Sequence, residues 1–469
     1  MPRLALALLL ACLLLTACSP TVILLGDKTE TPTRAPTLKP PLVVRTPRAT
    51  LPPKPQISAS PDDLRGISIS LWHGLDGESG TLLAQMADEF SRTNTWGIRV
   101  DVVSQKNLSL LVESVEAALD TPEQPDLALA FPEYAQTWDA QGQVIDLTPY
   151  IADPNVGLTD AEIQDIPSVF WKQGQVDAKR LSVPAMRTGR FLFYNTSFAK
   201  ELGFNSPPQS ADDFRKQACA ANASWKTDDD QSNDGFGGWV LENDAADTDA
   251  PWTAYGWLNA LGGNVYTNGN YAFFTPKNRE ALGFLAKLRS DGCAWLSSAL
   301  SNYEALAVHK ALFAAGSLYH LRDQRAAFAA SPDRWTVIPF PGATPAMVVY
   351  GPDYIVLKSS EARQLAAWLF VRWMLSPENQ ARWQRATGLF PMRASAVDLL
   401  DNIRNANPQW SAAMALVAQA KTYSLAPGWP KARLVLGDGF FHIFQGNPTS
   451  RDVANALNEM DGIMKDLLP

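Results

Sequence analysis

Histidine and cysteine are scarce in this chain, and the scarcity of histidine argues against a metal site. The 469 residues include only four cysteines and four histidines, namely His73, His309, His320 and His442. The histidines are too scattered for a zinc signature, and no HExxH sequence occurs. The sequence therefore predicts no bound metal, and nothing in it suggests a cofactor.

Basic charge is also lacking. The formal net charge is −8, so no basic stripe is available to neutralise phosphates, and we expect no nucleic-acid partner. A content of 46% hydrophobic and 19% charged residues is ordinary for a soluble globular protein, and the length allows two or three domains. The 15 tryptophans and 11 tyrosines supply rings that can stack against sugar faces.

The N-terminus has the features of an export signal. Arg3 precedes an apolar run from Leu4 to Leu15 that is too short to span a bilayer, and Leu15-Thr-Ala-Cys18 resembles a bacterial lipobox. The resemblance implies a signal peptide over residues 1–17, a diacylglyceryl thioether on Cys18 and an extracytoplasmic protein anchored to the outer face of the cell membrane. An uncleaved or conventionally cleaved signal is the alternative. Residues 18–61 are rich in proline and threonine, which predicts an extended tether.

Strand and helix patterns alternate from Gly66 onward. Ile67–Leu71 and Ile98–Val103 alternate as strands, and Thr81–Phe90 between them has helical spacing, which predicts a parallel βαβ unit. A further strand is expected at Asp126–Ala130. The pattern indicates an α/β fold, in which ligands gather beyond the carboxyl ends of the strands. The candidate ligand contacts at these ends are Trp72, His73, Asp76, Glu78, Glu133 and Tyr134.

The segment Leu181–Asn195 predicts a crossing between two lobes. Two short apolar runs flank Pro184–Gly189, whose proline and glycine break any helix. This places Met186 and Arg187 at the mouth of an interlobe cleft, although an ordinary loop within one domain fits the pattern too. Later in the chain, Ser317–Leu321 is expected to be a strand, and Gly351-Pro352 interrupts another strand in the manner of a second crossing.

Several motifs in order carry a family resemblance. These are Phe198–Phe204 with Pro207-Pro208 and Asp213-Phe214, Ala311–Gly316, Ala366–Phe370 with Ser376–Asn379, and Thr387–Pro391. From Gly66 to the C-terminus the chain resembles the extracellular solute-binding proteins of sugar ABC importers, the maltodextrin-binding type. The resemblance implies a type II periplasmic-binding-protein fold with three crossings, near Met186, Tyr350 and Phe390. The expected lobes are residues 62–186 with 352–388, and 187–351 with 389–469.

The resemblance also implies a function and partners. A sugar or oligosaccharide would be held between the lobes of a monomer and delivered to membrane permease subunits. Rings would pack on its C–H faces, and carboxylates, amides and arginines would bind its hydroxyls. Candidates from the second lobe and the crossings are Met186, Arg187, Trp257, Arg322, Tyr350 and Trp429. For each residue taken singly, packing in the core or exposure on a solvated surface is as good an explanation as contact with a ligand. The two arginines leave an anionic ligand open, and a polyol or glycerol phosphate could replace the sugar.

Catalytic motifs are absent or incomplete. No GxSxG occurs, and Ser197-Phe-Ala-Lys200 matches SxxK of penicillin-recognising enzymes only in isolation. Arg187-Thr-Gly189 is similar to their KTG element, but it precedes the serine, whereas in those enzymes KTG follows it and SDN lies between. We expect a binding protein and no enzyme. A lipid-anchored glycoside hydrolase stays the alternative, because carboxylate pairs cannot be judged without distances.

Two cysteines remain once Cys12 leaves with the signal and Cys18 is lipidated. Outside the cell, Cys219 and Cys293 are expected to form a disulfide, with two buried thiols as the alternative. Asp230–Gly235 resembles the first half of a calcium loop, but Leu241 stands at the twelfth position, where a bidentate glutamate is needed. A solvated turn is therefore the favoured interpretation.

Overall fold

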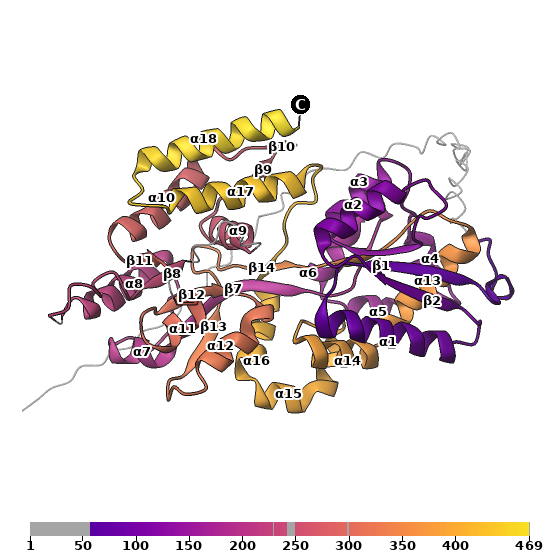
Figure 1. Cartoon of the computed structure of the whole chain (residues 1–469), viewed down its shortest axis with the longest axis horizontal. Helices are drawn as coiled ribbons and strands as arrows, with labels where there is room; N and C mark the ends of the chain where they lie inside the picture. Colours follow the sequence, from indigo (N-terminus) through magenta and orange to yellow (C-terminus); the bar gives the residue numbers. More distant parts are fainter. Residues whose placement is uncertain (1–56, 228, 242–248, 298–299, 469) are drawn as a thin grey trace, which may run out of the picture. The chain divides into compact units, whose positions relative to one another are not determined.

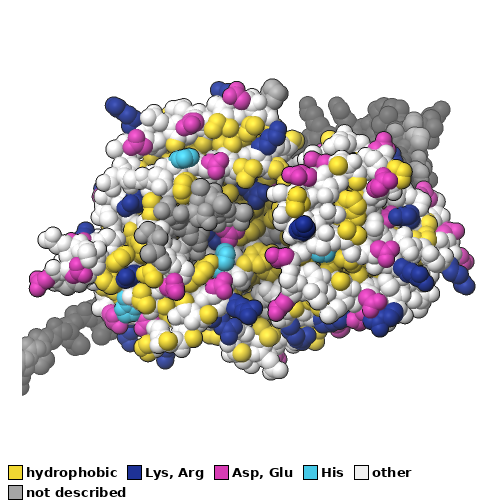
Figure 2. All heavy atoms as spheres, in the orientation of Figure 1, with side chains coloured by type: hydrophobic (Ala, Val, Ile, Leu, Met, Phe, Trp, Pro, Cys, Tyr) yellow, Lys and Arg dark blue, Asp and Glu magenta, His cyan; other side chains and the backbone are white. Residues whose placement is uncertain are grey.

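The computed structural model describes residues 57–227, 229–241, 249–297 and 300–468. The expected signal peptide, Cys18 and the tether up to residue 56 lie outside these ranges. Among the described residues, no helix has both the length and the apolar character needed to cross a membrane. Figure 2 shows basic and acidic side chains interspersed over one face of the molecule, without a basic stripe on that face.

The first lobe is built on a five-stranded sheet. Its order is β2 (Arg99–Ser104), β1 (Ser68–His73), β3 (Leu127–Ala130), β15 (Asp353–Val356) and β6 (Val183–Pro184). β1 is parallel to β2 and β3, as the expected βαβ unit requires, and β15 runs antiparallel to β3. Helix α1 (Gly77–Thr93) buries Leu83, Met86, Ala87 and Phe90 because their spacing places them on one face. The late helices α13 (Glu361–Met374) and α14 (Pro377–Thr387) return to this lobe (Figure 1).

The second lobe is built on a seven-stranded sheet. Its order is β11 (Ala294–Leu296), β8 (Trp239–Leu241), β12 (Phe313–Gly316), β7 (Thr188–Asn195), β14 (Met347–Tyr350) and β16 (Ala420–Lys421), and β13 (Trp335–Ile338) also pairs with β7. Helix α9 (Ala250–Ala260) is buried on almost every side, because α17 (Trp429–Ile443), β7 and β14 pack around it. Figure 1 shows α17 and α18 (Ser450–Leu467) side by side, with α10 (Pro276–Ser290) next to α18.

Shorter elements complete the described chain. Among the described residues, five segments form 3₁₀ turns, namely Pro61–Leu64, Lys172–Gly174, Leu318–His320, Ala394–Leu400 and Leu416–Gln419. The expected strand at Ser317–Leu321 is wrong, because β12 ends at Gly316 and the 3₁₀ turn Leu318–His320 follows, in which the His320 amide donates to the Ser317 carbonyl oxygen at 3.1 Å. The remaining helices and strands are α2 (Leu108–Ala118), α3 (Pro132–Asp139), α4 (Thr148–Ala152), α5 (Asp160–Gln164), α6 (Ser168–Trp171), β4 (Gln175–Val176), β5 (Lys179–Arg180), α7 (Thr196–Glu201), α8 (Ala211–Trp225), β9 (Tyr266–Thr267), β10 (Asn270–Tyr271), α11 (Asn302–Ala307), α12 (Leu321–Ala327), α15 (Asp401–Ala406) and α16 (Pro408–Ala415).

The chain passes between the two sheets through short segments. β6 belongs to the first sheet and β7 to the second, so one crossing lies between Pro184 and Thr188. β14 and β15 place a return crossing between Tyr350 and Asp353. An isolated bridge between Arg187 and Phe390 brings the segment after α14 to the same place. The predicted α/β class, with two lobes and crossings between them, is confirmed.

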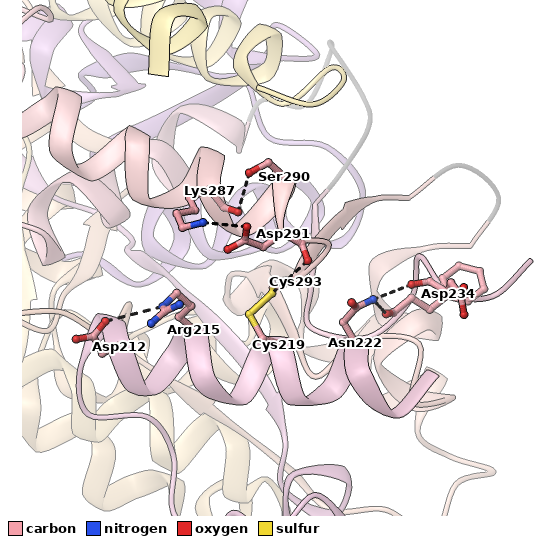
Figure 3. Close-up of a disulfide and its surroundings, with 10 residues drawn as sticks. Asp212, Arg215, Cys219, Asn222, Asp234, Lys287, Ser290, Asp291 and Cys293 are labelled. Carbon is pink, nitrogen blue, oxygen red and sulfur yellow. Dashed lines mark hydrogen bonds and ion pairs between the residues drawn. A yellow bond between two sulfur atoms is a disulfide. The ribbon is translucent and has the colours of Figure 1, made fainter. Parts of the chain in front are cut away.

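A disulfide fastens one edge of the second lobe. Cys219 on α8 is bonded to Cys293, which directly precedes β11 (Figure 3), and the expected pairing is confirmed. Nearby, the Asp230 carboxylate accepts hydrogen bonds from the amide and hydroxyl of Ser232, at 2.9 and 2.6 Å. That arrangement is the favoured solvated turn.

Removing the disulfide will destabilise the second lobe. Bridging cysteines 74 residues apart stabilises a fold by about 4 kcal/mol in the chain-entropy model. We expect the full chain carrying Cys219→Ser and Cys293→Ser to lose free energy of unfolding on that order in urea titrations. Reductant should lower the midpoint of the wild type and leave that of the double variant unchanged. Equal midpoints for the two proteins without reductant would contradict the prediction.

Candidate binding site between the lobes

A buried arginine holds the crossing segments together. The side chain of Arg187 is fully buried and donates from Nη2 to Asp353 at 2.5 Å and from Nε to Gln173 at 2.8 Å. Its Nη1 donates at 2.9–3.0 Å to three carbonyl oxygens of the two crossing segments, those of Met186, Gly351 and Pro352. Every guanidinium nitrogen is therefore engaged. The prediction that Arg187 contacts a ligand is corrected: its donors are used to join the lobes.

Aromatic rings form a stack beside the crossings. The ring of Trp252 on α9 lies parallel to that of Tyr350 at the end of β14, with centroids 4.3 Å apart and planes 10° apart. Tyr423 and Trp429 contact Trp252 at 5.0 and 6.2 Å. Phe131, which follows β3 of the first lobe, stacks on Trp252 at 6.4 Å. The stack thus contains rings from both lobes.

An acidic and a basic side chain lie against this stack. Glu133, in the first turn of α3, is buried, and its Oε2 accepts a hydrogen bond from the Tyr423 hydroxyl at 2.8 Å. The guanidinium of Arg433 on α17 lies 5.3 Å from the ring centroid of Trp252 and 5.5 Å from that of Phe131. Oε1 of Glu133 and Nε of Arg433 are buried without a hydrogen-bond partner among the described residues. One acceptor and one donor are therefore left for a polar ligand.

Burial sets the protonation of these groups. Removal from water raises the pKa of the Glu133 carboxyl, and the positive charge of Arg433 opposes that rise only in part. Burial and the Glu133 charge raise the pKa of the Tyr423 hydroxyl well above its usual value, so Tyr423 stays a donor. Glu133 and Tyr423 come from different lobes, and their hydrogen bond is a direct polar contact between them.

Asp249 holds the Tyr350 ring in place. Its Oδ1 accepts from the Tyr350 hydroxyl at 3.0 Å, and its Oδ2 accepts from Nη1 of Arg190 at 2.8 Å. Nε of Arg190 donates to Thr253 at 2.8 Å. Burial and the Asp249 charge raise the pKa of Tyr350 well above its ordinary value. The tyrosine is thus kept neutral, with its ring flat against Trp252.

Comparison with known proteins identifies the family to which this chain belongs. The sequence profile of the bacterial extracellular solute-binding proteins matches residues 85–418. The chain belongs to that family. A search of the curated proteins gives no match.

Solved structures share the fold of this solute-binding protein. A cyclic α-maltosyl-1,6-maltose binding protein from Arthrobacter globiformis matches with a TM-score of 0.70 at 20% identity, over 85% of this chain and 99% of that one. The sugar-binding protein MalE from Xanthomonas citri matches with a TM-score of 0.71 at 18% identity, over 85% and 98%. UgpB from Mycobacterium tuberculosis, solved with glycerophosphocholine, matches with a TM-score of 0.68 at 20% identity, over 86% and 98%. The predicted type II periplasmic-binding-protein fold is confirmed.

The structure brings some predicted contacts together and not others. Glu133, Tyr350 and Trp429 lie in or against the stack described above. Tyr134 is half-buried and stacks on Trp138 instead. Met186 is buried in the core at the crossing.

The four predicted contacts at the end of β1 and in the loop after it range from buried to exposed. Trp72 is half-buried, and Asp76 and Glu78 are exposed at the start of α1. His73 is buried, its Nδ1 accepts from the Leu75 amide at 3.0 Å, and burial lowers the pKa of its imidazole. These four residues stay predicted contacts.

One further prediction is corrected. Trp257 is fully buried in the second lobe's core, with ring centroids 4.8 Å from Phe214 and 5.3 Å from Phe340, so its ring belongs to the core. Arg322 lies exposed on α12 and, like Asp76 and Glu78, stays a predicted contact. The residues that sequence reasoning missed are Phe131, Asp249, Trp252, Tyr423 and Arg433. Only Phe131 had a signal, since it directly follows a predicted strand.

Breaking the buried ion pair at the crossings will cost much stability. Arg187→Met leaves the Asp353 carboxylate buried without its charge partner, and we expect a loss of about 3–5 kcal/mol in urea unfolding. Arg92→Met is the matched control, because the Arg92–Asp88 pair is exposed and should be worth less than about 1 kcal/mol. If the two variants lose equal stability, Arg187 does not have the structural role assigned to it.

Glu133 will make stability depend on pH. Because its folded-state pKa is raised, the folded protein binds more protons than the unfolded chain between the ordinary carboxyl pKa and the raised value. Stability should therefore fall as pH rises through that window, and Glu133→Gln should gain stability over the wild type at neutral pH but not near pH 4. Urea titrations from pH 4 to 8 measure the difference, with the exposed Glu123→Gln as control. A difference that does not change with pH would disprove this effect.

Proposed function

We propose that this protein is the substrate-binding component of an ABC importer and captures a sugar or oligosaccharide between its lobes. The observation that carries the proposal is a pair of buried atoms, Oε1 of Glu133 and Nε of Arg433, which have no hydrogen-bond partner within the described part of the chain and lie beside a stack of aromatic rings. Rings suit the C–H faces of a sugar, and a carboxylate and a guanidinium suit its hydroxyls. Two structural neighbours, the cyclic α-maltosyl-1,6-maltose binding protein and the sugar-binding protein MalE, support the same class.

Capture would couple to closure of the lobes. Glu133 and Phe131 belong to the first lobe, and Trp252, Tyr423 and Arg433 to the second. A ligand that contacts both sets binds better when the lobes are close, so it shifts the population toward the closed form. A permease that binds only the closed form would then interact with the protein only when a ligand is bound.

Partners and location follow from the same proposal. The permease subunits in the membrane receive the ligand, a cytoplasmic ATPase drives them, and the binding protein works as a monomer that releases its ligand unchanged. Lipid on Cys18 and the Pro/Thr-rich tether would hold it at the outer face of the membrane. We do not propose the glycoside hydrolase, because Asp249, a carboxylate beside the stack, is engaged by Arg190 and Tyr350.

A ligand screen tests the proposal. The full chain is melted with mono- and oligosaccharides, polyols, glycerol phosphates and glycerophosphocholine, and each ligand that binds is checked for cleavage by chromatography. A sugar that binds the native state raises the melting temperature. Arg433→Met should weaken that sugar at least about tenfold, since it loses a charge-assisted hydrogen bond.

Lys431→Met is the matched control, because Lys431 is exposed on the same helix two residues away. Equal weakening by both variants would remove Arg433 from the site. A shift by phosphorylated ligands alone would replace the sugar with an anionic ligand, and recovery of a cleaved sugar would restore the hydrolase.

A further inference from the structure

His309, which is not part of the candidate site between the lobes, has an unusual backbone conformation. It lies in the turn between α11 and β12 with φ of 62°, in the left-handed region that disfavours residues with a Cβ. Such a conformation costs about 1 kcal/mol or more for a residue other than glycine, and it persists where the surroundings enforce it.

The surroundings fix the ring of His309. The imidazole stacks on Phe198 of α7, with centroids 4.5 Å apart and planes 12° apart. The carbonyl oxygen of His309 accepts a hydrogen bond from the indole nitrogen of Trp225 at 2.9 Å. The side chain is 29% exposed, so the fixed ring remains open to solvent on one side.

Two carboxylates meet the two nitrogens of this ring. Nε2 contacts Oδ2 of Asp333, and the same oxygen accepts a hydrogen bond from Nδ2 of Asn195 at 2.8 Å. Nδ1 lies 3.5 Å from Oε2 of Glu201, at the end of α7. One ligand atom from each of Glu201, His309 and Asp333 lies within 4.8 Å of the other two.

We propose that His309 and Asp333 bind a divalent transition metal ion, for which zinc is the best match. Imidazole nitrogen and carboxylate oxygen are both zinc ligands. The ion would take the place of the direct contact between Nε2 and Asp333. Glu201 would accept the Nδ1 hydrogen, as carboxylates beside metal-bound histidines do, and waters would complete the shell.

The ion would fasten segments that are distant in sequence. Asn195 ends β7, Glu201 ends α7, His309 precedes β12, and Asp333 precedes β13. All four lie at one end of the second lobe's sheet, where β7 pairs with both β12 and β13. The expectation of no metal, drawn from scattered histidines, did not consider one histidine meeting two carboxylates from distant segments.

The test uses the full chain, stripped with a chelator and titrated with Zn²⁺ in a calorimeter and with Co²⁺ in a spectrophotometer. We expect one equivalent of Zn²⁺ to bind and to raise the melting temperature. His309→Asn should abolish that binding and the cobalt spectrum of the site, and it should fold, because asparagine tolerates the left-handed conformation. Asp333→Asn should abolish binding too, and Glu201→Gln should weaken it about tenfold.

His442→Asn is the matched control, because His442 is exposed on α17. Binding that survives His309→Asn, binding lost in His442→Asn, or no binding by the wild type would each overturn the proposal. If His309→Asn melts abnormally without metal, Asp333→Asn and Glu201→Gln decide between the outcomes. No sugar enters these measurements, so they stand apart from the proposed function.

Discussion

The buried pair of Arg187 and Asp353 is the interaction on which the arrangement of the lobes depends. Where the chain leaves one sheet for the other, its carbonyl groups lose their strand partners, and a buried carbonyl without a partner is costly. The guanidinium supplies donors for three such carbonyls and a counter-charge for Asp353. Gly351 completes the close approach, because it has φ of 148° and a Cβ there would lie 2.4 Å from the Met186 oxygen.

The same crossing sets the geometry of the candidate binding site. Asp353 pairs with Ala130, the last residue of β3, so Phe131 and Glu133 begin directly beyond the paired position. Three residues before Asp353, Tyr350 ends β14 opposite Thr188. The distance from the first lobe's carboxylate to the second lobe's aromatic stack is therefore controlled by two strand registers and one ion pair. Because both registers start at the crossing, the site can be assembled accurately from residues far apart in sequence.

Sequence patterns could predict the elements and only part of the site. Periodicity is local, so the βαβ unit and the ends of β1 and β3 were accessible, and Glu133 was found through its strand end. Trp252 and Trp257 show the limit. They are roughly 140° apart on one helix, and α9 is buried all round, so hydrophobicity could not tell which ring meets the first lobe. Tyr423 and Arg433 lie 290 and 300 positions after Glu133, and only tertiary packing brings them to it.

Arg187 shows the same limit of sequence-based prediction, here for a residue that was predicted to contact the ligand and does not. The sequence does not distinguish an exposed arginine from a buried one. Arg187 was expected to contact a ligand because it lies near a predicted crossing. Its burial among carbonyls requires the return crossing at Gly351, 164 residues later. A charged residue at a crossing can therefore be needed as a donor to buried carbonyl groups, and it is then not available to a ligand.

The unsatisfied atoms explain how ligand and closure can be linked. With the lobes in contact, one oxygen of the buried Glu133 and one nitrogen of Arg433 have no partner among the residues that the structure describes. A buried polar group without a partner costs about 1–3 kcal/mol. Closing the lobes without a ligand thus carries a penalty that hydroxyls of a bound ligand would remove. The rings would add affinity to any ligand that packs on them. The polar pair would make closure depend on the ligand, since only a ligand that bonds to both groups would remove the whole penalty.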